Sequence, residues 1–159
     1  VLVPEVLMSS RAMYTGFAIV RPLLKRPESH IRARVLIGTV RGDLHDIGKN
    51  LVKLMLEGKG FEVIDLGVDV PPERFVSEAL AQNCRFVCMS TLLTSTMCRM
   101  EDVLTLMRRR QVRNRFIVMV GGAPVTAEFA TRIGADIYAK TAIEAARAAE
   151  AAIKKENRI

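Results

Sequence analysis

Short apolar runs and amphipathic stretches alternate along most of the chain. Apolar runs rich in Val, Ile and Phe, which are typical of β-strands, occupy residues 35–40, 61–66, 86–90, 116–120 and 136–139. Between and after these runs, the spacing of apolar residues predicts helices at residues 48–57, 71–82, 96–110, 127–133 and 141–155. This alternation predicts an α/β fold, in which helices cover both faces of a parallel sheet.

The first residues follow a different pattern. Val6, Met13, Phe17 and Val20 fall near one face of a predicted helix, which needs a partner to cover it. The polar segment 25–31 is typical of a linker. We therefore expect a helix over residues 1–24, a linker over 25–31 and the α/β domain over 32–159.

Five strand-helix units favour the flavodoxin-like strand order 2-1-3-4-5. In that order, ligands bind at the carboxyl ends of strands 1 and 3, where the order of the strands reverses. The loop with His45 follows strand 1, the segment that begins at Ser90 follows strand 3, and Gly121 and Gly122 follow strand 4. These three loops should converge at one edge of the sheet.

Composition narrows the class of protein. A chain of 159 residues, half of them apolar, is long enough for one domain with a packed core. It contains no apolar run of the ~18 residues that a membrane span requires. Its start lacks the basic region of a secretory signal. We expect a cytoplasmic protein that does not bind membranes, and an internal fragment, because it does not begin with Met.

The charge and the cysteines add little chemistry. The net charge is +7, with basic residues clustered at Arg108–Arg110, Arg113 and Arg115. Such a cluster suits an anion or a nucleic acid, but it also suits a solvated helix end. We favour the helix end and expect no nucleic-acid partner, since no aromatic residue interleaves. Cys84, Cys88 and Cys98 lack metal-site spacing and are expected to be reduced thiols.

The loop after the first strand excludes two kinds of phosphate chemistry. Five residues separate Gly42 from Gly48, and Asn50 stands where a P-loop needs a hydroxyl for magnesium. A phospho-receiver domain needs an acid at the end of strand 3, where Ser90 stands. Nucleotide hydrolysis and phosphoryl acceptance are therefore not expected.

A metal-ligand function for His45 competes with a structural one. A histidine at a helix start can simply bond the backbone, with Asp43 and Asp46 as capping acids. However, Asp43 is placed to orient the imidazole, and Gly48 lets another group approach the backbone. One nitrogen cannot hold an ordinary zinc or iron ion, but it can complete a cobalt that a corrin ring already holds.

The same residues resemble a known family. Asp43-x-His45-x-x-Gly48, Ser90-x-Leu92 and Gly121-Gly122 occur in the order and spacing of the cobalamin-binding domain of corrinoid proteins and methionine synthase. The resemblance covers residues 32–159 and includes Thr94 and the segment Gly134–Ala139. It departs after Ala139, where Lys140-Thr141 replaces the usual proline or acid.

This resemblance implies a binding mode and a set of contacts. His45 would replace the lower base of cobalamin, or of a related corrinoid, as the axial ligand of cobalt, in the base-off, His-on mode. Asp43 would bond the other ring nitrogen, and Ser90 would support Asp43. The cofactor-binding residues implied are Asp43, Leu44, His45, Asp46, Ile47, Gly48, Ser90, Leu92, Thr94, Gly121, Gly122, Tyr138 and Ala139. Of these, Ser90, Leu92, Thr94, Gly121 and Gly122 would line the channel of the displaced nucleotide tail.

The sequence of residues 45–50, His-Asp-Ile-Gly-Lys-Asn, is similar to that of the methyl-transfer branch of the family. It implies a non-catalytic carrier whose cofactor alternates between Co(I) and methylcobalamin, and which works with a methyl-donor:corrinoid methyltransferase and a second methyltransferase. Residues 1–24 resemble the last helix of a helical cap that is otherwise missing. The chain could also form a homodimer. The alternative functions are a cobalamin sensor, the small subunit of a cobalamin mutase and a flavodoxin-like protein without a corrinoid. The methyl donor and acceptor are not indicated.

Overall fold

The computed structural model describes residues 3–20 and 32–158, which belong to two units of the chain, residues 1–30 and 31–159. The first unit holds helix α1, Val3–Val20. Met13 on this helix is 43% exposed. The side chains of Val6, Phe17 and Val20, on which the predicted apolar stripe also depends, lie outside the described residues, as does the predicted linker 25–31.

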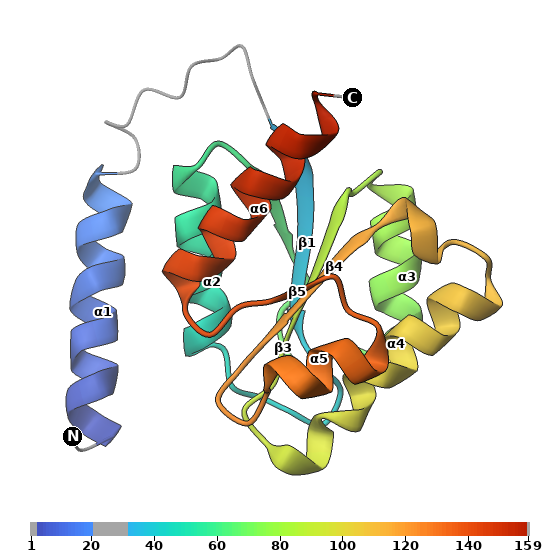
Figure 1. Ribbon diagram of the computed structural model, residues 1–159. Helices are drawn as coiled ribbons and strands as arrows, with labels where there is room; N and C mark the ends of the chain where they lie inside the picture. The colour runs from blue at the N-terminus through green and yellow to red at the C-terminus, as the bar shows by residue number, and fades with distance from the viewer. Residues whose placement is uncertain (1–2, 21–31, 159) are drawn as a thin grey trace. The chain divides into compact units, whose positions relative to one another are not determined.

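The second unit contains five parallel strands in the order β2-β1-β3-β4-β5, which confirms the predicted fold (Figure 1). The strands are β1 (Arg34–Thr39), β2 (Glu62–Asp65), β3 (Phe86–Ser90), β4 (Ile117–Gly121) and β5 (Ile137–Tyr138). The helices are α2 (Ile47–Gly58), α3 (Pro72–Ala81), α4 (Cys98–Arg109), α5 (Ala127–Ile133) and α6 (Ala142–Glu156), and two short 3₁₀ helices are η1 (Thr94–Thr96) and η2 (Arg113–Arg115).

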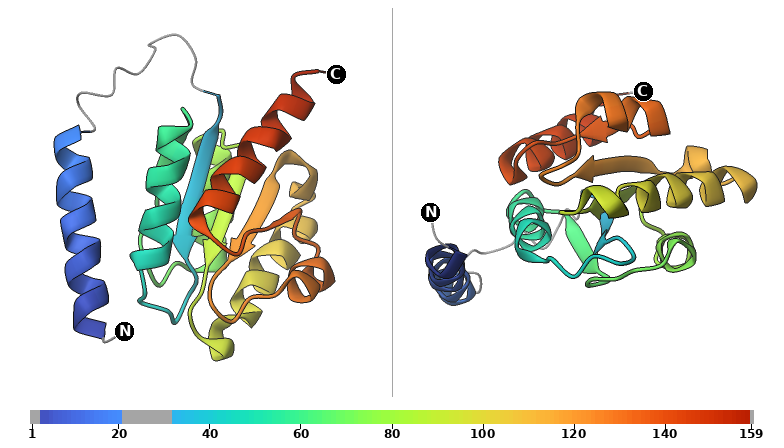
Figure 2. Two further views of the ribbon diagram at one scale, coloured as in Figure 1. Left: turned by 60° about the vertical axis from the view of Figure 1, so that its left-hand side comes forward. Right: turned by 90° about the horizontal axis from the view of Figure 1, so that it is seen from below.

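Helices lie on both faces of the sheet (Figure 2), and each face buries its own apolar cluster. Successive strand residues point to opposite faces, so β3 sends Val87 and Met89 to one cluster and Phe86 and Cys88 to the other. Helices α3, α4 and α5 complete the first cluster, and helices α2 and α6 complete the second. Burial on both faces explains why the strands are continuous apolar runs rather than alternating ones.

Register places the loops of interest at one edge. Thr39 pairs with Ser90, and Ser90 pairs with Gly121, so β1, β3 and β4 end level with one another. The loops that follow these strands lie together at the lower edge of the sheet in Figure 1. The predicted convergence of the three loops is therefore confirmed.

The structure also places the basic cluster and the cysteines. In the basic cluster, Arg108 donates to the Ile133 carbonyl and Arg113 to the Gly134 carbonyl, both at the carboxyl end of α5. The three cysteines are free thiols; Cys84 and Cys88 are buried, and Cys98 is exposed. Burial raises the pKa of Cys84 to about 11 and that of Cys88 to about 12. Within residues 3–20 and 32–158, no helix is both long and apolar enough to span a membrane.

Candidate functional site

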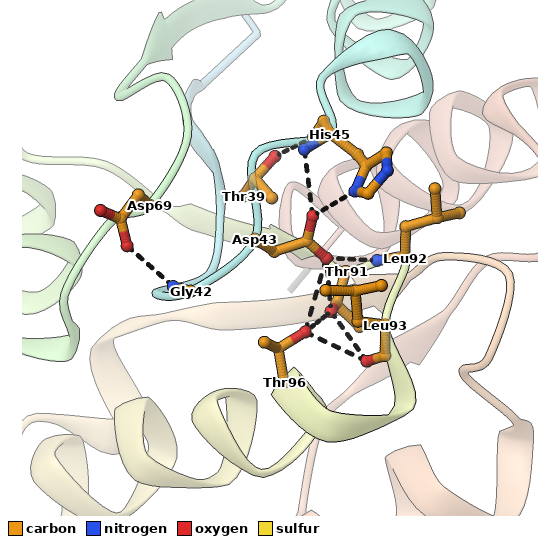
Figure 3. A network of polar contacts seen from close by, with 9 residues as sticks. All are labelled: Thr39, Gly42, Asp43, His45, Asp69, Thr91, Leu92, Leu93 and Thr96. Carbon is orange, nitrogen blue, oxygen red and sulfur yellow. Dashed lines mark hydrogen bonds and ion pairs between the residues drawn. The ribbon is translucent and has the colours of Figure 1, made fainter.

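The loop between β1 and α2 holds an aspartate and a histidine in direct contact. Asp43 is fully buried, and its Oδ1 lies 2.7 Å from the His45 Nδ1 and accepts the His45 backbone N–H at 3.0 Å. The His45 side chain remains 53% exposed. In Figure 3 its second ring nitrogen points away from the hydrogen-bond network. Asp43 therefore fixes the ring through Nδ1 and leaves Nε2 available.

The second carboxylate oxygen of Asp43 is held by the segment after β3. The Leu92 backbone N–H donates to Oδ2 at 2.6 Å, and the Thr91 hydroxyl donates to it at 2.9 Å. Thr96 lies 3.4 Å from the same oxygen, and its hydroxyl is 2.6 Å from that of Thr91 (Figure 3). Both threonine side chains are buried.

The expectation that Ser90 supports Asp43 is therefore wrong, because Thr91 takes that position. Adjacent residues of an extended strand point to opposite faces. Thr91 continues the side of Val87 and Met89, where Thr96 and Asp43 also lie, whereas Ser90 continues the other side. The sequence showed a run of hydroxyl residues here, but not which of them the strand directs toward Asp43.

The surroundings of Asp43 control its charge. Burial raises the pKa of Asp43, but the backbone N–H groups of Leu92 and His45, the His45 ring and the Thr91 hydroxyl stabilise the carboxylate. These hydrogen bonds outweigh burial and hold its pKa well below the ordinary value. Asp43 is therefore a charged acceptor that keeps a proton on the His45 Nδ1.

Thr39 and Asp69 fix the backbone of the loop through three further hydrogen bonds. The Thr39 hydroxyl donates to the His45 carbonyl at 2.8 Å. Asp69, from the loop after β2, accepts the Gly42 N–H at 2.7 Å and donates its own N–H to the Asp43 carbonyl at 3.0 Å. The imidazole is thus presented by a braced loop rather than a free one.

The surface around His45 is open and apolar. Leu44 is 71% exposed, Leu92 45% and Leu93 39%. A Cβ added at Gly48, in the first turn of α2, would meet nothing within 4 Å. Asp46 precedes α2 but its side chain makes no capping bond, and Ile47 begins the helix. Exposed leucines beside a half-exposed ring favour a flat apolar ligand.

Glycines after β4 let two backbones approach each other. A Cβ on Gly122 would lie 1.8 Å from the Thr91 carbonyl oxygen, and Gly122 has a φ of +132°. A Cβ on Gly121 would lie 2.8 Å from the Ala139 carbonyl oxygen. Both glycines, predicted as lining of a channel, thus also have a packing reason to be glycine.

The remaining predicted residues lie at the same edge with less defined roles. Thr94 begins η1 and is exposed. Tyr138 is half-buried and packs against the core on the α3–α5 face, while Ala139 is buried in the cluster under α2 and α6.

A cavity of about 290 Å³ lies between α3 and α4 and is lined by Arg41, Pro72, Glu73, Arg99, Asp102, Thr105, Leu106 and Arg109. Within residues 3–20 and 32–158, no three His, Cys, Asp or Glu side chains are grouped to hold an ion.

Comparison with known proteins agrees with this geometry. The sequence profile of the B12 binding domain family matches residues 33–148. The chain belongs to this family. The B12 binding domain includes every strand of the sheet and the whole Asp43–His45 loop.

Known corrinoid proteins are similar to this chain in sequence as well as in fold. Dimethylamine corrinoid protein 3 of Methanosarcina mazei is 41% identical over 143 residues, covering 89% of this chain and 86% of that protein. The monomethylamine corrinoid protein of Methanosarcina barkeri is 34% identical with a TM-score of 0.77, covering 96% of this chain and 72% of that one. The methanol:cobalamin methyltransferase complex MtaBC of the same organism has a matching chain with 27% identity and a TM-score of 0.75, covering 97% of this chain and 58% of that one.

Proposed function

We propose that this B12 binding domain holds a corrinoid through His45 and serves as a methyl carrier between methyltransferases. The observation that carries the proposal is the half-exposed His45 ring, whose Nδ1 is engaged by a buried, charged Asp43. Histidines that ligate metals almost always donate their other ring N–H to such a group. The similarity to methylamine corrinoid proteins supports the same function.

The residues around His45 fit a corrin ring. Ordinary structural metal ions need about four ligands, whereas a corrin-held cobalt needs one from below. Leu44, Leu92 and Leu93 would cover apolar surface of the ring, each contributing about 1.5–3 kcal/mol if fully buried. The open space at Gly48 admits the ring edge close to the backbone of α2.

The protein would control the cofactor through the axial histidine. Asp43 keeps the Nδ1 proton in place and increases the basicity of Nε2, which would face cobalt. The bound corrinoid supplies a cobalt centre that can take up and release a methyl group. Thr91 and Leu92 in turn stabilise the charge of Asp43, so the segment after β3 would act on the metal through Asp43.

If His45 ligates cobalt, the nucleotide tail of the corrinoid would need contacts elsewhere on the protein. We propose Ser90, Thr94, Gly121, Gly122 and Tyr138 as these contacts, since they lie at or after the carboxyl ends of the neighbouring strands β3, β4 and β5. Ala139 would support this site indirectly, because its backbone carbonyl packs against Gly121.

The partners would be a methyltransferase that methylates the cofactor and a second one that removes the methyl group. The first is supported by the methanol:cobalamin methyltransferase complex, which contains a chain of this fold. Residues 1–24 would be the last helix of a cap. Met8 and Ile19 on α1 are 72% and 66% exposed, so this helix has apolar surface available for other cap helices.

Spectroscopy of the reconstituted full chain tests the ligand. The protein is grown with ¹⁵N-histidine or without it, loaded with hydroxocobalamin and reduced to the Co(II) form. An axial ¹⁴N nitrogen splits the electron paramagnetic resonance lines into triplets, and ¹⁵N splits them into doublets. We expect doublets in the labelled protein and none in His45→Gln. Triplets that persist after labelling would mean that the corrinoid keeps its own base.

A second experiment tests the carrier function. The loaded protein is reduced and mixed with a corrinoid methyltransferase and candidate methyl donors, and methylation is followed by absorbance. We expect methylation that requires both the methyltransferase and a donor. Turnover of an adenosylcobalamin-dependent isomerisation with a large subunit would instead indicate a mutase.

A further inference from the structure

A buried lysine lies in the first turn of the helix that follows His45. The Lys49 residue is 3% exposed, although lysine is almost never buried unless its charge is paired. Its ammonium donates to both carboxylate oxygens of Asp65 at 2.8 Å and to the Asn50 side-chain oxygen at 2.6 Å. The pair joins α2 to the end of β2.

This pair stands in for a helix cap. Asp46 occupies the N-cap position of α2, yet its side chain makes no capping bond, so the cap does not fix where the helix begins. Lys49 lies within the first turn, and its contacts with Asp65 hold that turn against the sheet. The start of α2 is therefore set from β2 rather than from its own cap.

The same carboxylate connects to the other side of His45. Asp65 accepts the Gly67 N–H at 2.9 Å, and the Gly67 carbonyl accepts the Thr39 N–H at 2.9 Å. Thr39 then donates its hydroxyl to the His45 carbonyl at 2.8 Å. Two routes thus run from Asp65 to the segment that carries the imidazole, one through Lys49 and α2, and one through Gly67 and Thr39.

Stability alone is a weak reason for such an arrangement. Taking an ammonium and a carboxylate out of water is costly, and well-packed apolar side chains often serve the fold as well. What the ion pair adds is direction, because it requires one position of the helix start relative to β2. We propose that Lys49, paired with Asp65, is a positioning residue that sets the orientation of His45 as an axial ligand. This inference rests on the proposed function of His45.

The lysine one turn later provides a matched control. Lys53 also approaches Asp65, at 3.6 Å, but its side chain is 30% exposed and no hydrogen bond joins the two residues. Lys49→Met and Lys53→Met remove the same charge from the same helix and the same partner. Only the first removes the buried hydrogen bonds.

The experiment measures axial ligation rather than activity. The wild type, Lys49→Met and Lys53→Met are loaded with hydroxocobalamin and reduced to Co(II). The fraction of cobalt with the histidine nitrogen splitting is then read from the resonance spectrum of ¹⁵N-histidine protein. We expect the ratio of His-on to His-off cobalt to fall about 10–100-fold in Lys49→Met, the range typical of outer-shell partners. The ratio in Lys53→Met should remain that of the wild type.

Asp65→Asn serves if Lys49→Met does not fold. It keeps the size of the side chain and an oxygen for the Gly67 N–H, but it removes the charge that Lys49 requires. We expect the same loss of His-on cobalt. A wild-type His-on ratio in whichever of these two variants folds, even with lowered stability, would show that the pair serves only the fold. If the wild type itself shows no histidine splitting, the proposed function fails and this inference falls with it.

Discussion

Replacing Thr91 by valine tests whether this residue, and not Ser90, holds Asp43. Valine keeps the branched shape and nearly the volume of threonine, so the change leaves no large cavity at this buried position. It removes the 2.9 Å hydrogen bond to a buried oxygen of the Asp43 carboxylate and the hydroxyl–hydroxyl contact with Thr96. Ser90→Ala is the matched control, because no hydrogen bond of its hydroxyl to Asp43 is found.

The expected magnitude follows from the charge of the acceptor. A hydrogen bond to a charged group contributes about 1.5–3 kcal/mol, twice or more the value for a neutral pair. Leu92 and His45 still donate to Asp43 in the variant, so its charge is not left without partners. We therefore expect Thr91→Val to lower the free energy of unfolding by about 1.5–3 kcal/mol, and Ser90→Ala to lower it by less than about 1 kcal/mol.

Urea unfolding of the corrinoid-free protein, followed by far-ultraviolet circular dichroism, measures this difference. With a slope of roughly 2 kcal/mol per molar urea for a small domain, the midpoint of Thr91→Val should fall by about 1 M. The slope itself should not change, since the folded surface is the same. If Ser90→Ala costs as much as Thr91→Val or more, the assignment of Thr91 as the support of Asp43 is wrong.

Three other predictions follow from the same contacts. Gly122→Ala should destabilise the protein by roughly 2–6 kcal/mol in urea titrations, because of backbone strain and the clash with Thr91. Gly48→Ala should leave the corrinoid-free protein as stable as the wild type or up to about 1 kcal/mol more stable, while it weakens corrinoid binding. Equal stabilities of the two variants would contradict the prediction for Gly122. Burial raises the pKa of Asp65, but Lys49 and the Gly67 N–H lower it by more, so the pKa in the folded protein lies below the unfolded one. The stabilising effect of Asp65 is therefore fully present above about pH 4, the unfolded pKa, and is lost as the pH falls through the lower folded pKa. Urea midpoints should accordingly decline less steeply below about pH 4 in Asp65→Asn than in the wild type, and parallel declines would show that Asp65 makes no such contribution. Thr141→Ala should lower stability by about 0.5–2 kcal/mol in thermal melts, because its hydroxyl oxygen caps α6 by accepting the Glu144 N–H, and Thr141→Ser should restore most of the loss.

Much of the fold could be predicted from local pattern. The predicted strand 86–90 and helix 127–133 match β3 and α5, and the other strands and α-helices of the domain begin and end within about two residues of their predicted bounds. Local signals of this kind succeed because the central strands β1, β3 and β4 are buried on both faces and the helices on one, which constrains residue types along the chain.

The candidate site divides along the same line. The contact of Asp43 with His45 spans two residues, so the motif alone was enough to predict it. The roles of Thr91, Thr96 and Lys49 were missed. The sequence does not distinguish Lys49 from an ordinary lysine on the surface of a helix, because its partner Asp65 is sixteen residues away along the chain.

The sequence by itself determined the alternation of strands and helices, the order of the loops along the chain and the pairing of His45 with Asp43, since all of these depend on residues close together in the chain. Only the tertiary structure decided which hydroxyl reaches Asp43, why Gly122 has no side chain and where the charge of Lys49 is paired. Those features arise where segments distant in the chain meet at the end of the sheet. There, strand pleat, register and burial select one partner among several that are chemically equivalent in the sequence.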